Sequence, residues 1–357
     1  MEVIEKLNQL IEEEIARGAF PGANYAIVFK DSIYYGSLGN KRLLPNHEIN
    51  SLDTIYDMAS LSKVVSTTSC IMKLLELGKL RLFTKVKTYI HEFRHPNVSI
   101  WHLITHTSGL PEGLRNILSY HNKKEIIDAI CQSDLVYEPG TKISYSDLGF
   151  IMLGEIVEKV SGMPLNEFAE KYIFKPLDMN DTGYNPKDIN RCAPTEERHD
   201  VILDGIVQGK VHDETSYLMG GVAGHAGLFS TVLDVSHFVQ MILNEGVYEG
   251  NRVFEKNTID RLFVPEVTQK TGVMVDEVTR GLGWVIASQA GPNGDLTSKD
   301  TIHHTGFTGT SIWIDRQNEI GFCLLTNRVH PTRANISHMD ARGRISNFIM
   351  SNFQKLK

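Results

Sequence analysis

The pattern of hydrophobic and polar positions divides this 357-residue chain into two β-rich ends and a mostly helical middle. Residues 2–18 carry leucine and isoleucine at helical intervals among charged side chains, which predicts a surface helix. Residues 24–29 and 33–38 are short runs of β-forming residues with a polar turn between them, and they predict a hairpin.

The C-terminal end has the same β-rich character. Residues 283–287, 309–314 and 320–326 predict strands, and residues 339–353 predict a closing helix. Between the two ends, residues 60–255 show no strand alternation and are predicted to be mainly helical.

These elements predict a single α/β (α+β) catalytic domain with two parts. Residues 1–57 and 256–357 would form an antiparallel sheet flanked by the terminal helices, and residues 58–255 would form an all-helical subdomain. Because active sites favour the junction between such parts, we expect the functional cleft to lie there.

Composition and charge exclude several classes of function. The chain is 41% hydrophobic and 22% charged, as globular proteins are, and a net charge of −7 provides no basic surface for nucleic acid. The N-terminus is acidic where a secretory signal is basic, and no apolar run is as long as a membrane span, so we expect a cytoplasmic protein without a membrane partner. The spacing of Cys70, Cys131, Cys192 and Cys323 indicates reduced thiols.

The first candidate for chemistry is Ser60-Leu61-Ser62-Lys63, at the start of a predicted helix. On a helix, an i, i+3 spacing puts the Ser60 hydroxyl and the Lys63 amine on the same side. Serine is a weak nucleophile unless a neighbouring base takes its proton, and a partly desolvated lysine can do so. The helix start also offers backbone N–H groups to an oxyanion. Taken alone, the motif is weak evidence, and a helix cap followed by a surface lysine is then the favoured interpretation.

Two further triplets follow in chain order. The sequence Y-S-D at 145–147 comes directly before a predicted helix over 148–160, and H-T-G at 304–306 comes before the predicted strand 309–314. Together with the serine motif they supply a nucleophile, a second base and a strand-edge triplet, which are the parts that acyl transfer needs.

With these motifs the sequence resembles the class C β-lactamases, D-alanyl-D-alanine peptidases and related esterases, in which S-x-x-K, Y-x-N and K-T-G or H-T-G follow in this order. Residues 103–110, 148–158, 173–177 and 224–231 look like further landmarks of that family. The likeness covers about residues 20–350 and implies the serine β-lactamase and D,D-peptidase-like fold, with an antiparallel sheet, flanking helices and a helical subdomain.

The resemblance implies a role for each matched residue. Ser60 would form the acyl-enzyme, Lys63 would accept or relay its proton, and Tyr145 would act as the shared general base and acid. The oxyanion would bind the backbone N–H groups of Ser60 and Phe307. The strand side of the cleft would be lined by His304, Thr305 and Gly306.

Two positions depart from the family pattern. Asp147 stands where the family usually has asparagine, and an anion there puts amide recognition in doubt. Asp147 also fits a purely structural role as the N-cap of the helix that begins at Leu148. His304 replaces the lysine of many members and removes a permanent positive charge, although some peptidases of the family carry the same H-T-G, so substrates with a carboxylate stay possible.

A zinc site is the main rival for the chemistry. His91-Glu92-Phe93-Arg94-His95 matches H-E-x-x-H, which on a helix supplies two zinc ligands and a general base. Pro96 follows at once and opposes the helix that this site needs, so we expect no metal. His102 and His106 are also four residues apart, and they fit a structural helix start.

Two other motifs compete with the chosen residues. A K-T-G occurs at 270–272, but in a polar stretch without a regular strand directly after it, so H-T-G at 304–306 is preferred. His225 lies between glycines and could face the cleft or serve a structural role. No G-x-S-x-G elbow is present, which disfavours an α/β-hydrolase.

The sequence therefore predicts a serine hydrolase that acts on an ester or amide through an acyl-enzyme, without a metal or an organic cofactor. Its substrate would be a small ester, a β-lactam or a cell-wall peptide, and the choice among esterase, D,D-peptidase, muropeptide amidase and β-lactamase stays open. A catalytically silent ligand-binding protein on the same fold is the alternative from another class.

Overall fold

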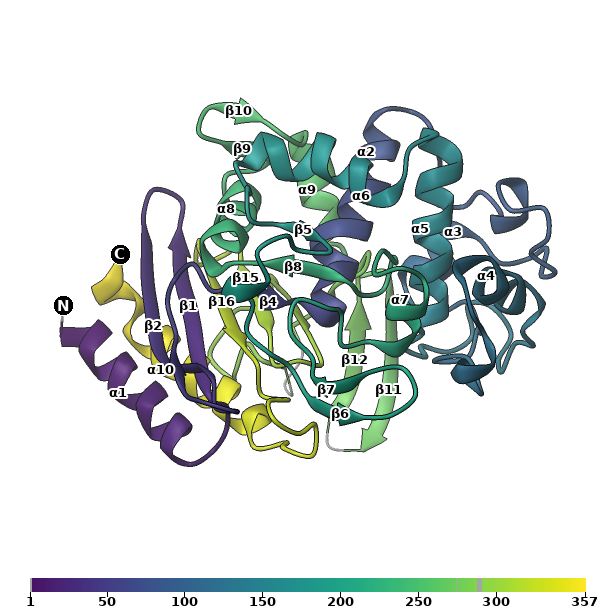
Figure 1. The fold of residues 1–357 in the computed structure, drawn as a ribbon. Helices are drawn as coiled ribbons and strands as arrows, with labels where there is room; N and C mark the ends of the chain where they lie inside the picture. The colour runs from purple at the N-terminus through teal and green to yellow at the C-terminus, as the bar shows by residue number, and fades with distance from the viewer. Residues whose placement is uncertain (1, 274, 288–290) are drawn as a thin grey trace.

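A nine-stranded antiparallel sheet forms the centre of the computed structural model, which describes residues 2–273, 275–287 and 291–357 (Figure 1). Its strands, in spatial order, are β11 (Val267–Val273), β12 (Val275–Arg280), β13 (Val285–Ile286), β14 (Thr301–Thr305), β15 (Ser311–Asp315), β16 (Ile320–Thr326), β1 (Gly22–Phe29), β2 (Ile33–Arg42) and β3 (Glu48–Ile49).

The two ends of the chain meet at the centre of this sheet. β1 forms the predicted hairpin with β2, where Val28 pairs with Ile33, and on its other side β1 pairs with β16, where Ala26 faces Cys323. Every residue of β1 and β16 is buried, as expected for strands covered on both faces. The predicted assembly of the sheet from both ends is confirmed.

Helices cover both faces of the sheet. On one face, α1 (Glu2–Ala16) and α10 (His338–Leu356) lie side by side (Figure 1) and pack Leu7 and Ile345 against the apolar side chains of β15 and β16. On the other face, α8 (Val232–Leu243) packs against β1 and β16. Although α8 lies within residues 58–255, it covers the sheet, and the division of the chain at residues 57 and 255 stays a prediction.

The middle of the chain supplies the helical part. Its α-helices are α2 (Ser69–Glu76), α3 (Ile100–Ile104), α4 (Lys123–Gln132), α5 (Asp147–Ser161), α6 (Leu165–Ala169), α7 (Glu214–Leu218) and, at its end, α9 (Lys256–Leu262). The central helix is α5, whose buried apolar residues pack against α2, α3, α4 and α6. The antiparallel sheet with flanking helices and a helical subdomain confirms the predicted fold class.

The structure adds strands that the sequence pattern did not predict. The helical middle and the residues just before it contain short strands of two or three residues, which have no detectable periodicity; they are β4 (Tyr56–Asp57), β5 (Gly183–Tyr184), β6 (Glu197–His199), β7 (Asp204–Ile206), β8 (Leu228–Ser230), β9 (Val247–Tyr248) and β10 (Asn251–Arg252). The expectation of no regular strand directly after the K-T-G at 270–272 is wrong, because β11 spans the triplet at the edge of the sheet and β12 follows it. A polar edge strand lacks the apolar alternation that the prediction used.

Two further expectations concern the cysteines and the absence of a membrane span. All four cysteines are buried and free. Across the described ranges, no helix combines the length and the apolar character that crossing a membrane requires.

Candidate active site

Ser60 lies in a tight, strained turn. It sits in a single 3-10 turn (Ala59–Leu61) that follows β4 and leads through a π-helical segment (Lys63–Thr68) into α2. Ala59 has a φ of 46°, in the left-handed region that residues with a side chain rarely adopt. The Asp57 carboxylate accepts the Ala59 N–H at 2.8 Å and stabilises this conformation. Strain of this kind concentrates where a side chain must be presented for function.

Lys63 links Ser60 to Asp147. Its side chain is completely buried, and its Nζ donates to the Ser60 Oγ at 2.8 Å and lies 2.7 Å from the Asp147 Oδ1. A third bond goes to the backbone oxygen of His225 at 3.0 Å. Burial alone would lower the pKa of Lys63, but the Asp147 carboxylate and the Tyr145 phenol outweigh it, so the pKa is raised. Lys63 is therefore an ammonium that donates to Ser60.

Asp147 is free to make this ion pair because it is not the helix cap. The N-cap of α5 is Ser146, whose Oγ accepts the Gly149 N–H, and Asp147 is the first residue of the helix. The expectation that Asp147 caps the helix is wrong by one position. The two residues are both good caps, and only the turn geometry decides which side chain reaches the backbone.

Tyr145 stands between two cations. The centre of its ring lies 4.9 Å from the Lys63 Nζ and 5.4 Å from the Arg280 Cζ. The ring also stacks on His106 at 4.5 Å, and the Nδ1 of His106 accepts the Ser146 N–H at 3.0 Å. Arg280 is buried, and its Nε and Nη1 have no hydrogen-bond partner in the described part of the chain. Sequence analysis missed His106 and Arg280 as parts of this site.

The H-T-G triplet ends β14 beside the nucleophile turn. His304 is buried, and burial together with the nearby Arg280 and Lys63 holds its pKa well below its usual range, so the imidazole is neutral. At Gly306, a Cβ would lie 2.1 Å from the Thr310 Oγ1 and 2.6 Å from the Met58 backbone oxygen. Only glycine therefore allows the strand to approach the serine turn this closely.

Two threonine hydroxyls attach the turn after the triplet to the nucleophile segment. Thr308 donates to the backbone oxygen of Asp57 at 2.7 Å, and Thr310 donates to that of Met58 at 3.1 Å. Phe307 lies within this turn, with half of its surface exposed. The turn that carries the Phe307 N–H is thus fixed next to the turn that carries Ser60.

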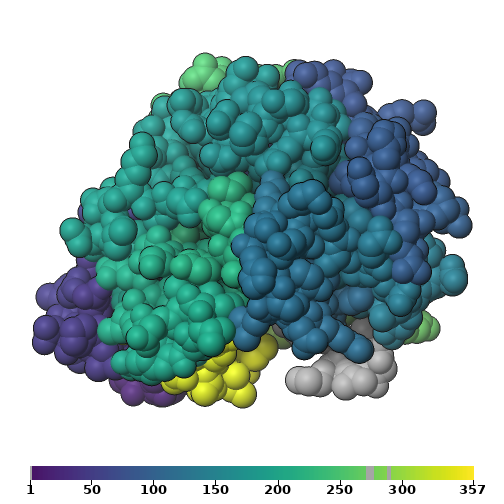
Figure 2. Space-filling model, turned by 45° about the vertical axis from the view of Figure 1, so that its right-hand side comes forward, coloured from purple at the N-terminus to yellow at the C-terminus, as the bar shows by residue number. Residues whose placement is uncertain are grey.

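These segments enclose a cavity of about 260 Å³. It is lined by Ala59, Ser60, Tyr145, Asp147, His212, Asp213, Glu214, His225, Ala226, Phe307 and Arg333. Figure 2 shows the face on which the blue helical segments meet the green middle of the chain, with a hollow between them. Of the sequence-predicted residues, Ser60, Tyr145, Asp147 and Phe307 line the cavity, Lys63 lies beneath it, and His304 faces the Tyr145 ring at 6.3 Å. Thr305 and Gly306 follow His304 at the end of β14.

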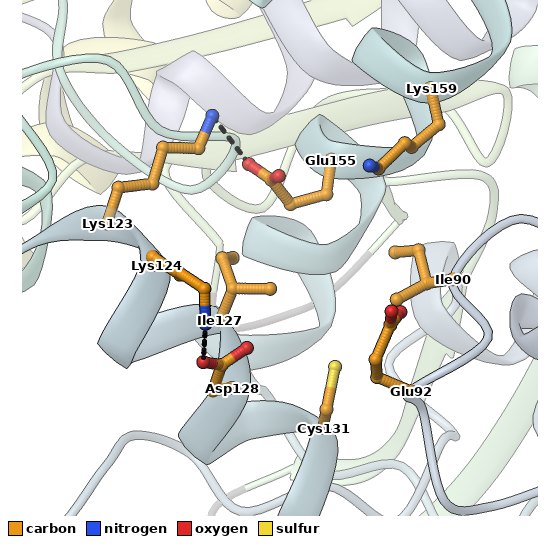
Figure 3. Close-up of a pocket in the computed structure, with 9 residues that line it drawn as sticks. All are labelled: Ile90, Glu92, Lys123, Lys124, Ile127, Asp128, Cys131, Glu155 and Lys159. Atoms are coloured by element: carbon orange, nitrogen blue, oxygen red, sulfur yellow. Dashed lines mark hydrogen bonds and ion pairs between the residues drawn. The ribbon is translucent and has the colours of Figure 1, made fainter.

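A larger cavity of about 380 Å³ lies in the helical part, away from Ser60 (Figure 3). It is lined by residues of α4, α5 and the chain near Ile90, and its ion pairs join Lys123 to Glu155 and Lys124 to Asp128. It holds none of the residues that form the serine site.

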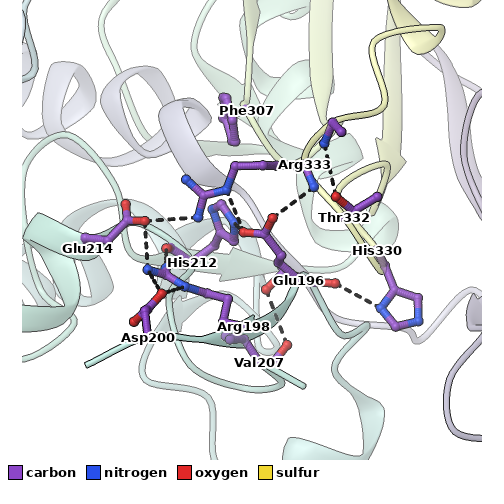
Figure 4. Close-up of polar contacts among 12 residues, drawn as sticks. Glu196, Arg198, Asp200, Val207, His212, Glu214, Phe307, His330, Thr332 and Arg333 are labelled. Carbon is purple, nitrogen blue, oxygen red and sulfur yellow. Dashed lines mark hydrogen bonds and ion pairs between the residues drawn. The ribbon is translucent and has the colours of Figure 1, made fainter. Parts of the chain in front are cut away.

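A polar network forms one wall of the serine cavity (Figure 4). Arg333 donates to Glu196 at 2.6 Å and to Glu214 at 3.0 Å, and Glu196 also contacts the His212 ring at 3.1 Å. The His212 ring in turn stacks on Phe307 at 5.6 Å. The network therefore fixes the Phe307 side chain at the mouth of the cavity.

A pair formed by His225 and Asp213 also lines the cavity. The His225 Nε2 is 2.8 Å from the Asp213 Oδ1, and this contact together with nearby Lys63 holds the pKa of the Asp213 carboxyl well below its usual range, although burial alone would raise it. Within the described residues, Asp147, Asp213 and His225 form a group whose ligand atoms lie within 4.8 Å of one another. Because the Lys63 ammonium, 2.7 Å from the Asp147 Oδ1, already places a cation beside these three residues, they fit an ion-pair network better than a metal site.

The H-E-x-x-H segment is not helical. Residues 91–95 form turns and irregular chain, and the His95 Nε2 is 2.7 Å from the Ser133 backbone oxygen. The two histidines therefore do not share a helix face, as the zinc motif requires.

We expect exhaustive chelation with EDTA to leave ester hydrolysis unchanged and elemental analysis to find no stoichiometric zinc. The reason is that the H-E-x-x-H segment does not form the helix that would present its ligands on one face, and that Lys63 supplies the cation beside Asp147. Activity that chelation removes and added zinc restores would overturn the serine mechanism.

Comparison with known proteins agrees with these motifs. The model of the Beta-lactamase family matches residues 7–343. The chain is 31% identical over 366 residues to the N-acetylmuramyl-L-alanine amidase of Bacillus subtilis (strain 168), covering 92% of this chain and 81% of the relative. It is also 31% identical over 372 residues to the putative D-alanyl-D-alanine carboxypeptidase of Salmonella agona (strain SL483), covering 93% and 84%. EstCE1, a hydrolase with promiscuous acyltransferase activity, has a similar fold, with a TM-score of 0.78, 19% identity and coverage of 96% and 98%. The resemblance seen in the motifs is confirmed, and the chain belongs to the β-lactamase family of serine hydrolases.

Proposed function

We propose that this serine hydrolase cleaves uncharged small esters and related acyl compounds through an acyl-enzyme on Ser60. One observation carries the proposal: the Lys63 ammonium joins the Ser60 Oγ at 2.8 Å to the Asp147 carboxylate at 2.7 Å. An anion at this point opposes a substrate carboxylate, and the neutral His304 offers no charge to attract one. Both features favour neutral acyl groups.

In the proposed mechanism, the phenolate form of Tyr145 takes the proton of the Ser60 hydroxyl and becomes the neutral phenol. The Ser60 Oγ bonds to the substrate carbonyl carbon, and the resulting oxyanion accepts the N–H groups of Ser60 and Phe307. Collapse breaks the bond to the leaving group, which receives the proton from Tyr145. A water molecule then repeats the sequence on the acyl-enzyme and releases the acid, and Ser60 recovers its proton.

Lys63 and Arg280 have a supporting role in this proposal. Lys63 carries a proton already, so it stabilises negative charge on Ser60 and Tyr145 instead of accepting the proton of Ser60. Arg280 contributes a second positive charge on the Tyr145 ring at 5.4 Å. The form of Tyr145 that can accept a proton is the phenolate, and two cations beside the ring stabilise that anion.

A second candidate function is cleavage of an amide in a cell-wall fragment. It is supported by the identity of 31% to a relative named N-acetylmuramyl-L-alanine amidase. β-Lactam hydrolysis is a third possibility in the same family, and a cytoplasmic location stays a prediction of the sequence.

Activity-based labelling tests the proposed function. We expect a fluorophosphonate to label the protein at one site, intact mass to show one adduct, and p-nitrophenyl acetate to be hydrolysed faster than a penicillin. Peptide mapping should find the adduct on Ser60. A protein that neither turns over an ester nor reacts with fluorophosphonate or fluorescent penicillin would be a silent binding protein.

Changing Asp147 to asparagine is expected to shift the pH profile. The Asp147 anion raises the pKa of Lys63 and favours the protonated form of the Lys63 and Tyr145 pair. Activity rises with pH as this pair loses a proton, so removing the anion should move the rising limb to lower pH, by about 1 to 3 units for a close charge. The measurement is kcat/KM for p-nitrophenyl acetate from pH 5 to 10.

The same variant tests substrate choice. We expect the ratio of penicillin acylation to ester hydrolysis to increase roughly fivefold, because two solvated like charges repel by about 1 kcal/mol. The fold should persist, since Ser146 caps α5. An unchanged profile and ratio, or a wild type that prefers penicillin, would contradict the assignment of Asp147.

A further inference from the structure

Arg342 is a buried arginine behind the turn that follows the H-T-G triplet. It belongs to α10 and is only 6% exposed. Its Nη2 donates to the Thr310 backbone oxygen at 3.0 Å and to the Gly306 backbone oxygen at 3.4 Å. The guanidinium therefore contacts both ends of the turn that contains Phe307.

A second arginine contacts the middle of the same turn. The Arg328 Nε donates to the Phe307 backbone oxygen at 2.8 Å, and its Cζ lies 4.4 Å from the centre of the Phe307 ring. Its Nη1 donates to the backbone oxygens of Arg333 and Asn335. Neither Arg328 nor Arg342 forms an ion pair with an acidic side chain in the part of the chain that the structure describes.

A buried guanidinium without a counter-ion is costly for the folded state. Burial and then the like charge of Arg328 lower the pKa of Arg342 to about 9, which shows how unfavourable the site is for a cation. The Arg342 Nε also lacks a hydrogen-bond partner among the described residues. Two carbonyl contacts could come from a neutral amide at lower cost, so the positive charge itself requires an explanation.

The explanation follows from the peptide group that Arg342 contacts. The Gly306 C=O and the Phe307 N–H belong to the same planar peptide. A charged donor on that oxygen fixes the plane and polarises the peptide, which strengthens the N–H at its other end as a donor.

We infer that Arg342 is a positioning residue for acyl transfer, which orients and polarises the Gly306–Phe307 peptide so that its N–H stabilises the oxyanion. This inference rests on the proposed function, because the oxyanion exists only if Ser60 attacks an acyl group. Arg328 holds the next peptide of the turn by its carbonyl and keeps Phe307 in place.

The test compares Arg342→Met and Arg342→Lys with the wild type, using kcat and KM for p-nitrophenyl acetate. A benzeneboronic acid, which forms a tetrahedral anionic adduct with a catalytic serine, measures stabilisation of the oxyanion. Removing a direct oxyanion donor lowers kcat by about 10² to 10³, so an indirect loss in Arg342→Met should lower kcat by roughly 10- to 100-fold. KM should stay near its wild-type value, and the affinity for the boronic acid should fall by the same factor as kcat. Arg342→Lys should recover part of kcat and part of the affinity for the boronic acid.

Ser346→Ala is the matched control on the same helix. Ser346 is buried, accepts the Trp313 Nε1–H at 2.9 Å and donates to the Pro292 oxygen, so its loss destabilises α10 without touching the turn. It should lower Tm and leave kcat unchanged. A kcat and a boronic acid affinity that stay at wild-type values in Arg342→Lys and Arg342→Met, or that fall equally in Ser346→Ala, would overturn the inference.

Failure of the proposed function would look different. In that case the wild type itself would show no ester hydrolysis and no adduct with the boronic acid. If Arg342→Met does not fold, Arg342→Lys and Arg342→Gln carry the test, since the lysine keeps the charge and the glutamine keeps only a neutral donor. A glutamine variant as active as the lysine variant would refute a role for the charge.

Discussion

Replacing Ser60 with alanine is expected to abolish turnover while the protein stays folded. Removal of the nucleophile of a serine hydrolase lowers kcat by as much as about 10⁶, because the covalent path is lost and only binding and electrostatic contributions remain. The Ser60 Oγ contacts the Lys63 Nζ, and Lys63 keeps its contacts with Asp147 and His225 in the variant. Loss of one hydroxyl at the edge of a cavity should therefore change Tm little.

The measurement is single-turnover and steady-state hydrolysis of p-nitrophenyl acetate, with intact mass after fluorophosphonate treatment. Ser69→Ala is a suitable control, because the Ser69 hydroxyl lies on α2 and donates to the Val64 backbone oxygen, away from the cavity. It should keep wild-type turnover and labelling. If Ser60→Ala retained wild-type activity, Ser60 would not be the nucleophile.

The contact between Ser60 and Lys63 is the part of the site that spacing alone could predict. Residues three apart on a helical turn share a face whatever the surrounding fold does, and the observed separation of 2.8 Å agrees with this. The contact of Lys63 with Asp147 could be expected only from the family resemblance, because residues 63 and 147 are far apart in the sequence and no local pattern relates them. The cap assignment failed because Ser146 and Asp147 are equivalent at the level of propensity.

Other parts of the site depend on long-range packing. His106 contacts Tyr145 through ring stacking, Arg280 reaches the same ring from β12, and Arg342 comes from the last helix. Each is an unremarkable residue within its own segment, and only the folded chain brings it to the cavity. A buried arginine without a carboxylate is a signal that appears in the structure and has no counterpart in sequence periodicity.

In the fold, as in the site, the sequence predicts the elements with a local pattern and misses those that depend on long-range packing. β1 and β16 carry continuous apolar runs because helices cover both faces of the sheet there, and the sequence predicted both strands. β14 contains two histidines within five residues, and β11 is a polar edge strand, so neither shows the apolar pattern. Their strand structure comes from pairing with β13 and β15 or with β12, which the local sequence does not encode.

Changing Tyr145 to phenylalanine is expected to lower the rate of acylation by about 10² to 10⁴, the usual contribution of a general base. Lys63 is protonated, so it cannot accept the Ser60 proton, and Tyr145 is the remaining titratable group of the proposed machinery beside it. Phenylalanine keeps the ring that stacks on His106 at 4.5 Å and lacks only the hydroxyl. The fold should therefore persist, and the loss should appear in kcat.

The pH profile separates this assignment from its rival. If Lys63 were the base, Tyr145→Phe would keep the wild-type pH profile and most of its rate, and Lys63→Met alone would abolish acylation. If Tyr145 is the base, the phenylalanine variant should lose the rising limb of kcat/KM, because the group whose deprotonation produced that limb is gone. Lys63→Met should also be slow in that case, since it removes the cation that stabilises charge on Tyr145 and Ser60. Deleting a general base lowers the rate by far more than about threefold. A Tyr145→Phe enzyme that retains more than about a third of wild-type acylation would therefore show that Lys63 is the base.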